Sequence, residues 1–333
     1  MMDPELLPET EALHPVIAEL LNTKFNKEYP IPAAIHSYRY MLTEFTRIAS
    51  FSDAEPASIH ELTFVPVELP EFKIRLYNAE SAVLKPVLVY FHGGNWVGGD
   101  LETCDAVCRT LAEESNYTVV SVDYALAPEH TFPVPLYQGL EVIDWIRKQG
   151  VFYGIDHHKV IVGGDNAGGN IAACLVHLLG DSKNFRLFGQ LLICPALNYS
   201  FDTPSYLEFD KGYLISREMM QNSWKTYLGN ADESYKRFAS LLSTANTSYV
   251  PPTLIYTAEY DPLRDEAEEY AACLKEQGIT VSFHRFKGVT HHFWLMDGIL
   301  NIARQAHSKA SAFLLHQQQS VVNLPHKNGC SAN

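Results

Sequence analysis

The stretch from Gly163 to Asn170 reads GGDNAGGN and joins two predicted elements. The apolar run Lys159 to Gly164 predicts a strand, and Gly168 to Leu179 predicts a helix. A strand-to-helix turn with glycine two positions before and after its central residue is typical of G-x-S-x-G, the turn that presents a serine nucleophile. Here the central residue is Asn166, whose amide nitrogen is a poor nucleophile because its lone pair is delocalised.

The glycines and the asparagine suit the backbone of such a turn. Side chains at Gly164 or Gly168 would collide with neighbouring main chain, and the central residue must adopt a positive φ. Asn tolerates that left-handed region better than most other residues with side chains. The sequence therefore keeps the geometry of the turn while lacking the hydroxyl.

A second chemical motif, FHGGNW, follows the predicted strand Pro86 to Phe91. It is similar to the HGGG-type loop whose main-chain N–H groups bind a developing oxyanion. We expect Gly93, Gly94 and Ala167 to direct their N–H groups at one oxygen, since glycine lets the main chain approach a bound carbonyl closely.

An acid and a histidine follow later in the chain. Asp261 stands at the end of the predicted strand Thr253 to Glu259, and His291 follows the last predicted strand, Val281 to Phe286. The chain order of nucleophile position, acid and histidine is the order of α/β hydrolases. A histidine oriented by an acid is a general base, so the sequence predicts an Asp261–His291 pair beside Asn166.

These residues must be positioned by a sheet whose strands alternate with helices. Further strands are predicted at Glu61 to Leu69, Phe72 to Tyr77, Tyr117 to Tyr124 and Gln190 to Cys194, and further helices at Leu101 to Glu114, Val134 to Gln149, Asp265 to Gln277 and Ile299 to His316. Such alternation indicates an α/β protein with a mostly parallel eight-stranded sheet and helices on both faces.

Three segments fall outside this rhythm. Residues 1–55 are helical in pattern, and the aromatic insertion within residues 200–229 lies between two strands. We predict that both cap a site at the carboxyl ends of the strands. The hydrolase domain is then residues 56–316, and the polar tail 317–333 is expected to be poorly ordered.

Five motifs, HGGNWVGGD, DYALAPEHTFP, GGDNAGGN, DPLRDE and GVTHHF, together resemble the hormone-sensitive-lipase-like carboxylesterases, which have the α/β-hydrolase fold. The resemblance runs from about residue 60 to residue 315. It implies that Asp261 is the triad acid, His291 the base, and Gly93, Gly94 and Ala167 the oxyanion donors. It also implies that Asp123, Tyr124 and Glu129 brace the loops.

The same resemblance implies a small ester or carbonyl ligand, with no cofactor and no metal. We expect Trp96 and Trp224 to shape the ligand pocket, with Asp165 and His292 also in contact with the substrate. Members of this family are often monomers or dimers, and a homodimer would use the last strand and helix.

Composition excludes other partner classes. The net charge of -14 disfavours binding to a phosphate backbone, so nucleic acid is not an expected partner. The sequence holds no apolar run of membrane-spanning or signal-peptide length, which favours a cytoplasmic location. Cys104 and Cys108 could share a helix face, but no second Cys/His pair has zinc-site spacing, so they are expected to be core residues.

Four interpretations of Asn166 remain open from the sequence. The Asp261–His291 pair could act as a general base without a covalent step, or the chain could be an ordinary carboxylesterase with an inactivating change. It could also be a non-enzymatic binding protein, as in the plant gibberellin receptor, which resembles the same family and lost another triad member. Deamidation of Asn166 to a carboxylate is the fourth interpretation, disfavoured because Asn-Ala is a poor deamidation pair.

Overall fold

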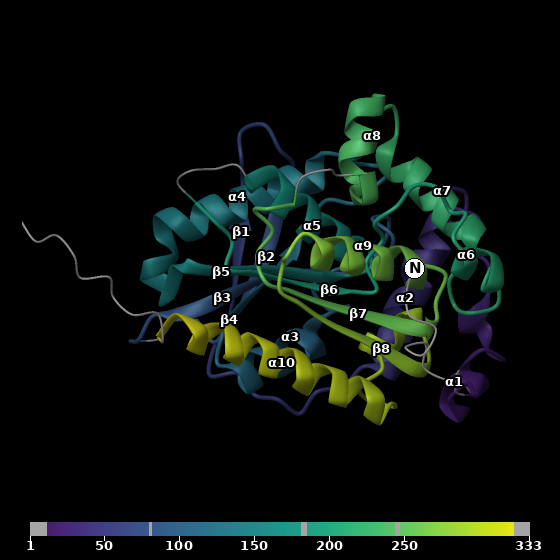
Figure 1. The fold of residues 1–333 in the computed structure, drawn as a ribbon, viewed down its shortest axis with the longest axis horizontal. Coiled ribbons are helices and arrows are strands. Elements are labelled where there is room, and N and C mark those ends of the chain that lie inside the picture. The colour runs from purple at the N-terminus through teal and green to yellow at the C-terminus, as the bar shows by residue number, and fades with distance from the viewer. Residues whose placement is uncertain (1–11, 80–81, 181–184, 244–246, 323–333) are drawn as a thin grey trace, which may run out of the picture.

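The computed structural model describes residues 12–79, 82–180, 185–243 and 247–322. Its centre is an eight-stranded sheet in the order β1-β2-β4-β3-β5-β6-β7-β8 (Figure 1). β1 and β2 are antiparallel to their neighbours, and all pairings from β4 to β8 are parallel. The strands are β1 (Ile59–Phe64), β2 (Phe72–Tyr77), β3 (Lys85–Phe91), β4 (Thr118–Asp123), β5 (Ile155–Asp165), β6 (Gly189–Ile193), β7 (Thr253–Tyr260) and β8 (Val281–Thr290).

Helices cover both faces of this sheet. α3 and α10 pack together on one face, and α4, α5 and α9 lie on the other (Figure 1). Their bounds are α3 (Asp105–Ser115), α4 (Val134–Gln149), α5 (Ala167–Leu179), α9 (Arg264–Glu276) and α10 (Asn301–Val322). This arrangement confirms the predicted α/β-hydrolase architecture.

Burial of the strands explains their composition. The central strand β6 is buried at all five positions, and β3 is buried at every position after Lys85. Strands covered on both faces need continuous apolar runs rather than alternation. The edge strand β1 instead alternates between exposed and partly buried residues, because one of its faces meets solvent.

Two groups of helices lie beyond the carboxyl ends of the parallel strands, at the right of Figure 1. We call residues 12–55 and 200–243 the cap segments. They contain α1 (Pro15–Leu20), η2 (Lys24–Asn26), α2 (Ile35–Ala49), α6 (Pro204–Glu208), α7 (Arg217–Leu228), α8 (Glu233–Ala239) and η4 (Leu241–Ser243). Outside the cap segments the described residues also form the 3-10 turns η3 (Gly150–Tyr153) and η5 (His291–Leu295). An isolated antiparallel bridge pairs Tyr213 with Ile215 within the second cap segment.

The cap segments are bonded to each other although they are far apart in sequence. Asn26 donates from its side chain to the main-chain oxygen of Gly212 at 3.1 Å and accepts from Leu214 N at 2.9 Å. Ser216 donates to the carboxylate of Glu28 at 2.6 Å. The proposed division into a cap and a hydrolase domain stays a prediction, but these contacts join its two cap parts.

Several predicted boundaries shift in the structure. The first strand ends at Phe64 rather than Leu69, and β8 continues to Thr290, directly before His291. The last helix continues to Val322 rather than ending at His316, and the rest of the expected tail lies outside the described residues. No helix within the described residues combines the length and apolar character needed to cross a membrane.

The close approach of α5 to β3 gives a test of the fold. A Cβ added at Gly168 would overlap the main-chain carbonyl of Phe91, which cannot move without shifting the sheet. We expect Gly168→Ala to lower the free energy of unfolding by about 1–3 kcal/mol, or to prevent folding. Chemical denaturation measures this change.

Gly150→Ala is the matched control, because the nearest atoms to its added Cβ lie at 3.3–3.5 Å and its φ is helical. It should unfold close to the parent. Equal stability of the two variants would contradict the tight packing at the start of α5.

Candidate active site

Asn166 occupies the turn between β5, which ends at Asp165, and α5, which begins at Ala167. Its backbone has φ 51° and ψ -114°, a conformation that is costly for most residues with side chains. A Cβ at Gly164 would overlap the carbonyl of Phe91, as one at Gly168 would. The glycines on both sides of Asn166 are therefore required by the close approach of β5 and α5 to β3.

Asp261 and His291 lie together beside this turn. His291 Nδ1 donates to Asp261 Oδ2 at 2.8 Å, and Leu263 N donates to Asp261 Oδ1 at 2.9 Å. Their side chains are 1% and 0% exposed. Because the carboxylate accepts from Nδ1, the other ring nitrogen, Nε2, carries the lone pair. The pair is thus arranged as a general base whose Nε2 faces the turn.

The side-chain amide of Asn166 bridges two groups. Asn95 N donates to Asn166 Oδ1 at 2.8 Å, and Asn166 Nδ2 lies 2.9 Å from His291 Nε2. A main-chain N–H can only donate, so its partner must be the amide oxygen, and the amide nitrogen then donates to the imidazole. In this conformation Asn166 occupies both a main-chain donor and the lone pair of the base.

In the loop after β3, the main-chain N–H that reaches Asn166 is not one of the N–H groups expected to do so. Gly93 N donates to Asp165 Oδ1 at 3.1 Å, so this N–H is already used in the present conformation. Asn95, which follows the two glycines, has the N–H that reaches Asn166. Asn95 was not among the expected oxyanion donors, because glycine was the residue type expected to donate. Asn95 nevertheless stands at the third position of the HGGG-type motif.

Backbone strain in this loop is concentrated at three successive residues. Gly94, Asn95 and Trp96 have φ values of 115°, 56° and 60°. A Cβ at Gly94 would overlap the carbonyl of Gly98. The loop therefore turns sharply enough to direct main-chain N–H groups toward the Asn166 turn, and Gly94 and Ala167 stay candidate donors.

A small cavity adjoins these groups. Its volume is about 30 Å³, and its lining residues come mainly from the cap segments: Phe25, Tyr29, Tyr38, Met41, Leu42, Phe45, Leu214, Met219 and His292. Asn95 Nδ2 donates to Tyr38 Oη at 3.2 Å and lies 3.5 Å from Met219 Sδ, which links the cavity wall to the loop. Ligand pockets usually exceed 300 Å³, so a ligand larger than a few water molecules requires the cap segments to move.

A family model described as the alpha/beta hydrolase fold matches residues 88–295 of this chain. The chain belongs to this family. An arylesterase of Saccharolobus solfataricus is 34% identical over 230 residues, which are 69% of this chain and 75% of the relative. An ethyl acetate hydrolase of Pseudomonas putida is 32% identical over 256 residues, covering 75% of this chain and 80% of that protein.

Solved structures support the same assignment. An α/β-hydrolase enzyme from the metagenome of Lake Arreo superposes with a TM-score of 0.85 at 32% identity, covering 92% of this chain and 99% of the other. An esterase of Pyrobaculum calidifontis superposes with a TM-score of 0.83 at 32% identity, covering 93% and 99%. The resemblance to carboxylesterases seen in the sequence is thereby confirmed for the fold and the family.

Two tryptophans predicted to contact substrate lie in an aromatic cluster of the hydrolase. Trp96 stacks on Tyr227 with ring centroids 4.6 Å apart and contacts Trp224 at 4.4 Å. Both tryptophans are fully buried and neither lines the cavity described above. They join the loop after β3 to α7, and their contact with a substrate stays a prediction. His292 does line the cavity, where it contacts Phe45 at 5.7 Å between ring centroids.

Residues of the segment predicted to brace the loops contact the glycine-containing loop after β3. Tyr124 donates to the main-chain oxygen of His92 at 2.7 Å, and its ring stacks on the His92 imidazole. Glu129 pairs with both terminal nitrogens of Arg39, whose guanidinium also donates to Ala127 O and Val97 O. Asp123 ends β4, so this segment ties α2 to the strand ends.

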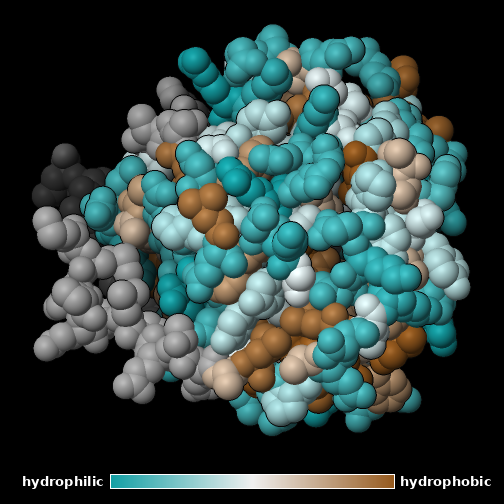
Figure 2. All heavy atoms as spheres, turned by 90° about the vertical axis from the view of Figure 1, so that its right-hand side faces the viewer, coloured by the Kyte–Doolittle hydropathy of each residue, from teal (hydrophilic) through white to brown (hydrophobic). Residues whose placement is uncertain are grey.

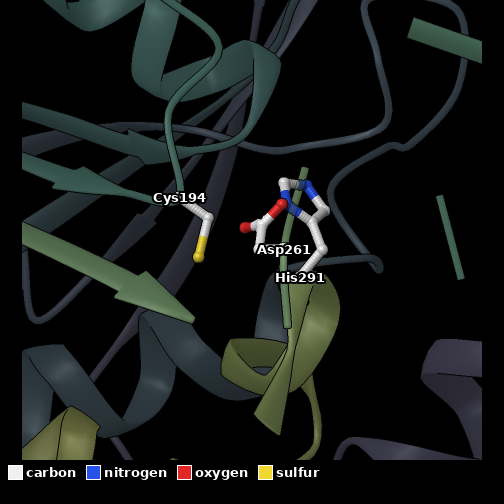
Figure 3. Close-up of side chains that lie close together, drawn as sticks. All are labelled: Cys194, Asp261 and His291. Atoms are coloured by element: carbon white, nitrogen blue, oxygen red, sulfur yellow. Dashed lines mark hydrogen bonds and ion pairs between the residues drawn. The ribbon is translucent and has the colours of Figure 1, made fainter. Parts of the chain in front are cut away.

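Figure 3 shows Asp261 between the thiol of Cys194 and the imidazole of His291. The ligand atoms of these three residues lie within 4.8 Å of one another, a spacing that could hold a metal ion. However, Nδ1 of His291 is engaged by Asp261, and burial with the nearby Asp261 carboxylate raises the pKa of Cys194 well above its usual value. A protonated thiol is a weak metal ligand and a weak nucleophile. Cys194 lies on the acid side of the pair and does not replace the missing hydroxyl.

Asp165 is buried and contacts the loop after β3, and its predicted contact with a substrate stays a prediction. Its Oδ1 accepts from Tyr90 Oη at 2.8 Å and from Gly93 N at 3.1 Å. Burial raises the pKa of Asp165 to about 6, and these hydrogen bonds together with nearby His291 offset part of that rise. Its observed contacts position the loop after β3.

The raised pKa of Asp165 makes stability depend on pH. Because the pKa of about 6 in the folded protein exceeds that of an exposed aspartate, the folded state binds the proton more tightly. This stabilisation is present below the unfolded pKa and is lost as pH rises through 6. Asp165→Asn removes the titration. The free energy of unfolding of Asp165→Asn minus that of the parent should therefore be about 1 kcal/mol larger at pH 7.5 than at pH 5.

Urea denaturation of both proteins at the two pH values checks this. The absolute stability of the variant is not the readout, since the new amide also changes the hydrogen bonds to Tyr90 and Gly93. A difference between the proteins that does not change with pH would mean that Asp165 does not titrate in this range.

Proposed function

We propose that this carboxylesterase-like hydrolase acts on a small ester or related carbonyl compound without forming a covalent intermediate. The proposal rests on the intact Asp261–His291 pair. Asn166, which cannot act as a nucleophile, lies between this pair and the main-chain N–H of Asn95. The names of the relatives, an arylesterase and an ethyl acetate hydrolase, support an ester as the substrate class.

In the proposed reaction, the side chain of Asn166 first rotates away from Asn95 and His291. The substrate carbonyl then accepts from Asn95 N and from neighbouring N–H groups, which stabilise the oxygen as it becomes negative. His291 Nε2 takes a proton from water, which attacks the carbonyl carbon. Asp261 holds the imidazole in position and stabilises it while it is protonated.

The rate of such a reaction is limited by the missing nucleophile. Loss of the serine from a triad costs about 10⁶ in kcat, and donors and binding retain about 10³–10⁴ over water. The hydrolase is therefore a slow catalyst for any ester that it turns over. The small cavity further favours compact acyl and alcohol groups.

An alternative is favoured by the contacts of Asn166 itself. Its amide occupies the donor and the lone pair that catalysis needs, which suits a non-enzymatic protein that binds a small molecule beneath the cap segments after these have moved. The surface over this end of the molecule carries small groups of hydrophobic side chains among hydrophilic ones (Figure 2). A third alternative, an ordinary carboxylesterase with an inactivating change, shares the same pocket and is separated by the first test.

Replacing Asn166 by serine tests the catalytic apparatus. We expect Asn166→Ser to hydrolyse short nitrophenyl esters at least about 10³-fold faster than the parent, because it restores a hydroxyl next to His291 Nε2. Release of nitrophenol measures the rate. Asn166→Ala is the control, since it removes the amide without adding a nucleophile.

Each outcome separates the alternatives. Measurable turnover by the parent supports the general-base mechanism, and activity in the serine form alone supports an inactivated esterase. No activity in the serine form, in a protein that remains folded, would favour the binding protein.

The role of His291 is tested on the residual activity of the parent. We expect His291→Gln to lower turnover by about 10²-fold or more, since it removes the base but keeps a hydrogen-bonding side chain. His284→Gln is the matched control, because His284 lies on β8, the strand that ends directly before His291, and its side chain is exposed. Equal rates for the parent and His291→Gln would remove the general-base role.

A further inference from the structure

The amide of Asn166 is held in the way that a hydrolase holds the bond it cleaves. Its oxygen accepts from the main-chain N–H of Asn95 at 2.8 Å, and its nitrogen lies 2.9 Å from His291 Nε2. A hydrolytic site needs a donor on the carbonyl oxygen and an acid next to the leaving group. The N–H of Asn95 meets the first need in the present conformation. His291 meets the second only after its Nε2 has taken up a proton, because Nε2 here accepts from the amide nitrogen.

We propose that Asn166 is a site of self-modification, at which His291 and a water molecule hydrolyse the side-chain amide to a carboxylate. The inference rests on the proposed function, because it uses the same base and the same main-chain donor. It extends that function because the first carbonyl group that the site hydrolyses is then the side-chain amide of Asn166 itself.

The step balances with water as the single co-reactant. The amide nitrogen of Asn166 first releases His291 Nε2, while Oδ1 keeps its hydrogen bond from Asn95 N. Nε2 then removes a proton from water, and the oxygen of that water forms a bond to Cγ of Asn166. The imidazolium returns the proton to the amide nitrogen, and the Cγ–N bond breaks. The products are an aspartate side chain at position 166 and ammonium, since the proton of the new carboxylic acid passes to the ammonia, and nothing is oxidised or reduced.

In the proposed step the water comes from the neighbouring cavity. The cavity has room for one or a few water molecules, and Tyr38 and Met219 in its wall both contact Asn95 Nδ2. The buried Oδ1 of Asn95 has no hydrogen-bond partner among the described residues, and a water molecule would satisfy it. Asn95 therefore contacts both the wall of the cavity and the amide of Asn166.

This route differs from ordinary deamidation. The ordinary route requires Ala167 N to attack Cγ and form a cyclic imide, which opens to aspartate and isoaspartate. Here both ends of the amide are held, at Asn95 and at His291. Attack by Ala167 N requires both contacts to break, whereas direct hydrolysis releases the one at His291 and keeps the one at Asn95. The unfavourable Asn-Ala sequence limits the imide route but does not limit direct hydrolysis.

The product is stabilised by the same contacts. One carboxylate oxygen keeps the hydrogen bond from Asn95 N, and the other faces His291, which can donate to it when protonated. A carboxylate is also a recognised covalent nucleophile in enzymes. Hydrolysis would therefore give position 166 the nucleophilic oxygen that the encoded residue lacks.

The test follows the mass of one peptide over time. The purified full-length chain is incubated at neutral pH in ordinary water and in heavy-oxygen water, then cleaved with trypsin. The peptide from Val160 to Lys183 contains both Asn166 and Asn170. We expect a gain at Asn166 of about one dalton in ordinary water and about three daltons in heavy-oxygen water, because one oxygen comes from the solvent, and no isoaspartate.

Asn170 is the internal control, because it is buried in the same peptide but its Nδ2 donates to Ala239 O, away from any imidazole. We expect Asn166 to convert at least about 10²-fold faster than Asn170, and His291→Gln to slow conversion at Asn166 by about the same factor. Asp261→Asn provides a second variant that should also slow it. Asn166→Asp supplies the reference peptide.

Three results would overturn the inference: no conversion at Asn166, a product containing isoaspartate, or an unchanged rate in both His291→Gln and Asp261→Asn. The readout uses no added ester. A failure of the proposed esterase reaction therefore leaves this measurement intact, and a failure here leaves the nitrophenyl-ester result intact.

Discussion

The site depends on one packing constraint, the contact of the turn at Asn166 with the end of β3. The backbone of β5 and α5 passes so close to the carbonyl of Phe91 that neither Gly164 nor Gly168 can carry a side chain. The turn that this contact requires gives Asn166 its positive φ, and the side chain of Asn166 lies between Asn95 N and His291 Nε2. Because the loop after Phe91 also supplies Asn95, the same contact sets the distance between the turn and its donor.

The positions of the other site residues follow from the parallel sheet. β5, β7 and β8 end at the same edge, so Asn166, Asp261 and His291 meet although up to 125 positions separate them. Asp165 holds the loop after β3 through Gly93, while Tyr124 holds it through His92. The geometry of the site is therefore maintained by buried hydrogen bonds that do not involve the reacting atoms.

The amide at position 166 changes what this geometry can do. A serine hydroxyl would donate to His291 and leave the main-chain donors free for a substrate. The amide of Asn166 is longer and has both a donor and an acceptor, so it fills both roles at once. The three proposals differ in what happens to this amide. It moves aside for a substrate in the slow reaction, stays in place in the binding protein, and is itself hydrolysed in the self-modification.

The sequence by itself determined the fold, the order of the motifs and the pairing of Asp261 with His291. Glycine spacing, apolar runs and motif order are local properties, and each reflects a backbone requirement that acts within a few residues. Only the tertiary structure decided which N–H of the loop reaches position 166, that Asp165 supports the loop, and that Trp96 and Trp224 pack together rather than line the cavity. These outcomes depend on how the cap segments, the loop after β3 and α7 fit together in space, and distances between remote side chains are not encoded in any local pattern.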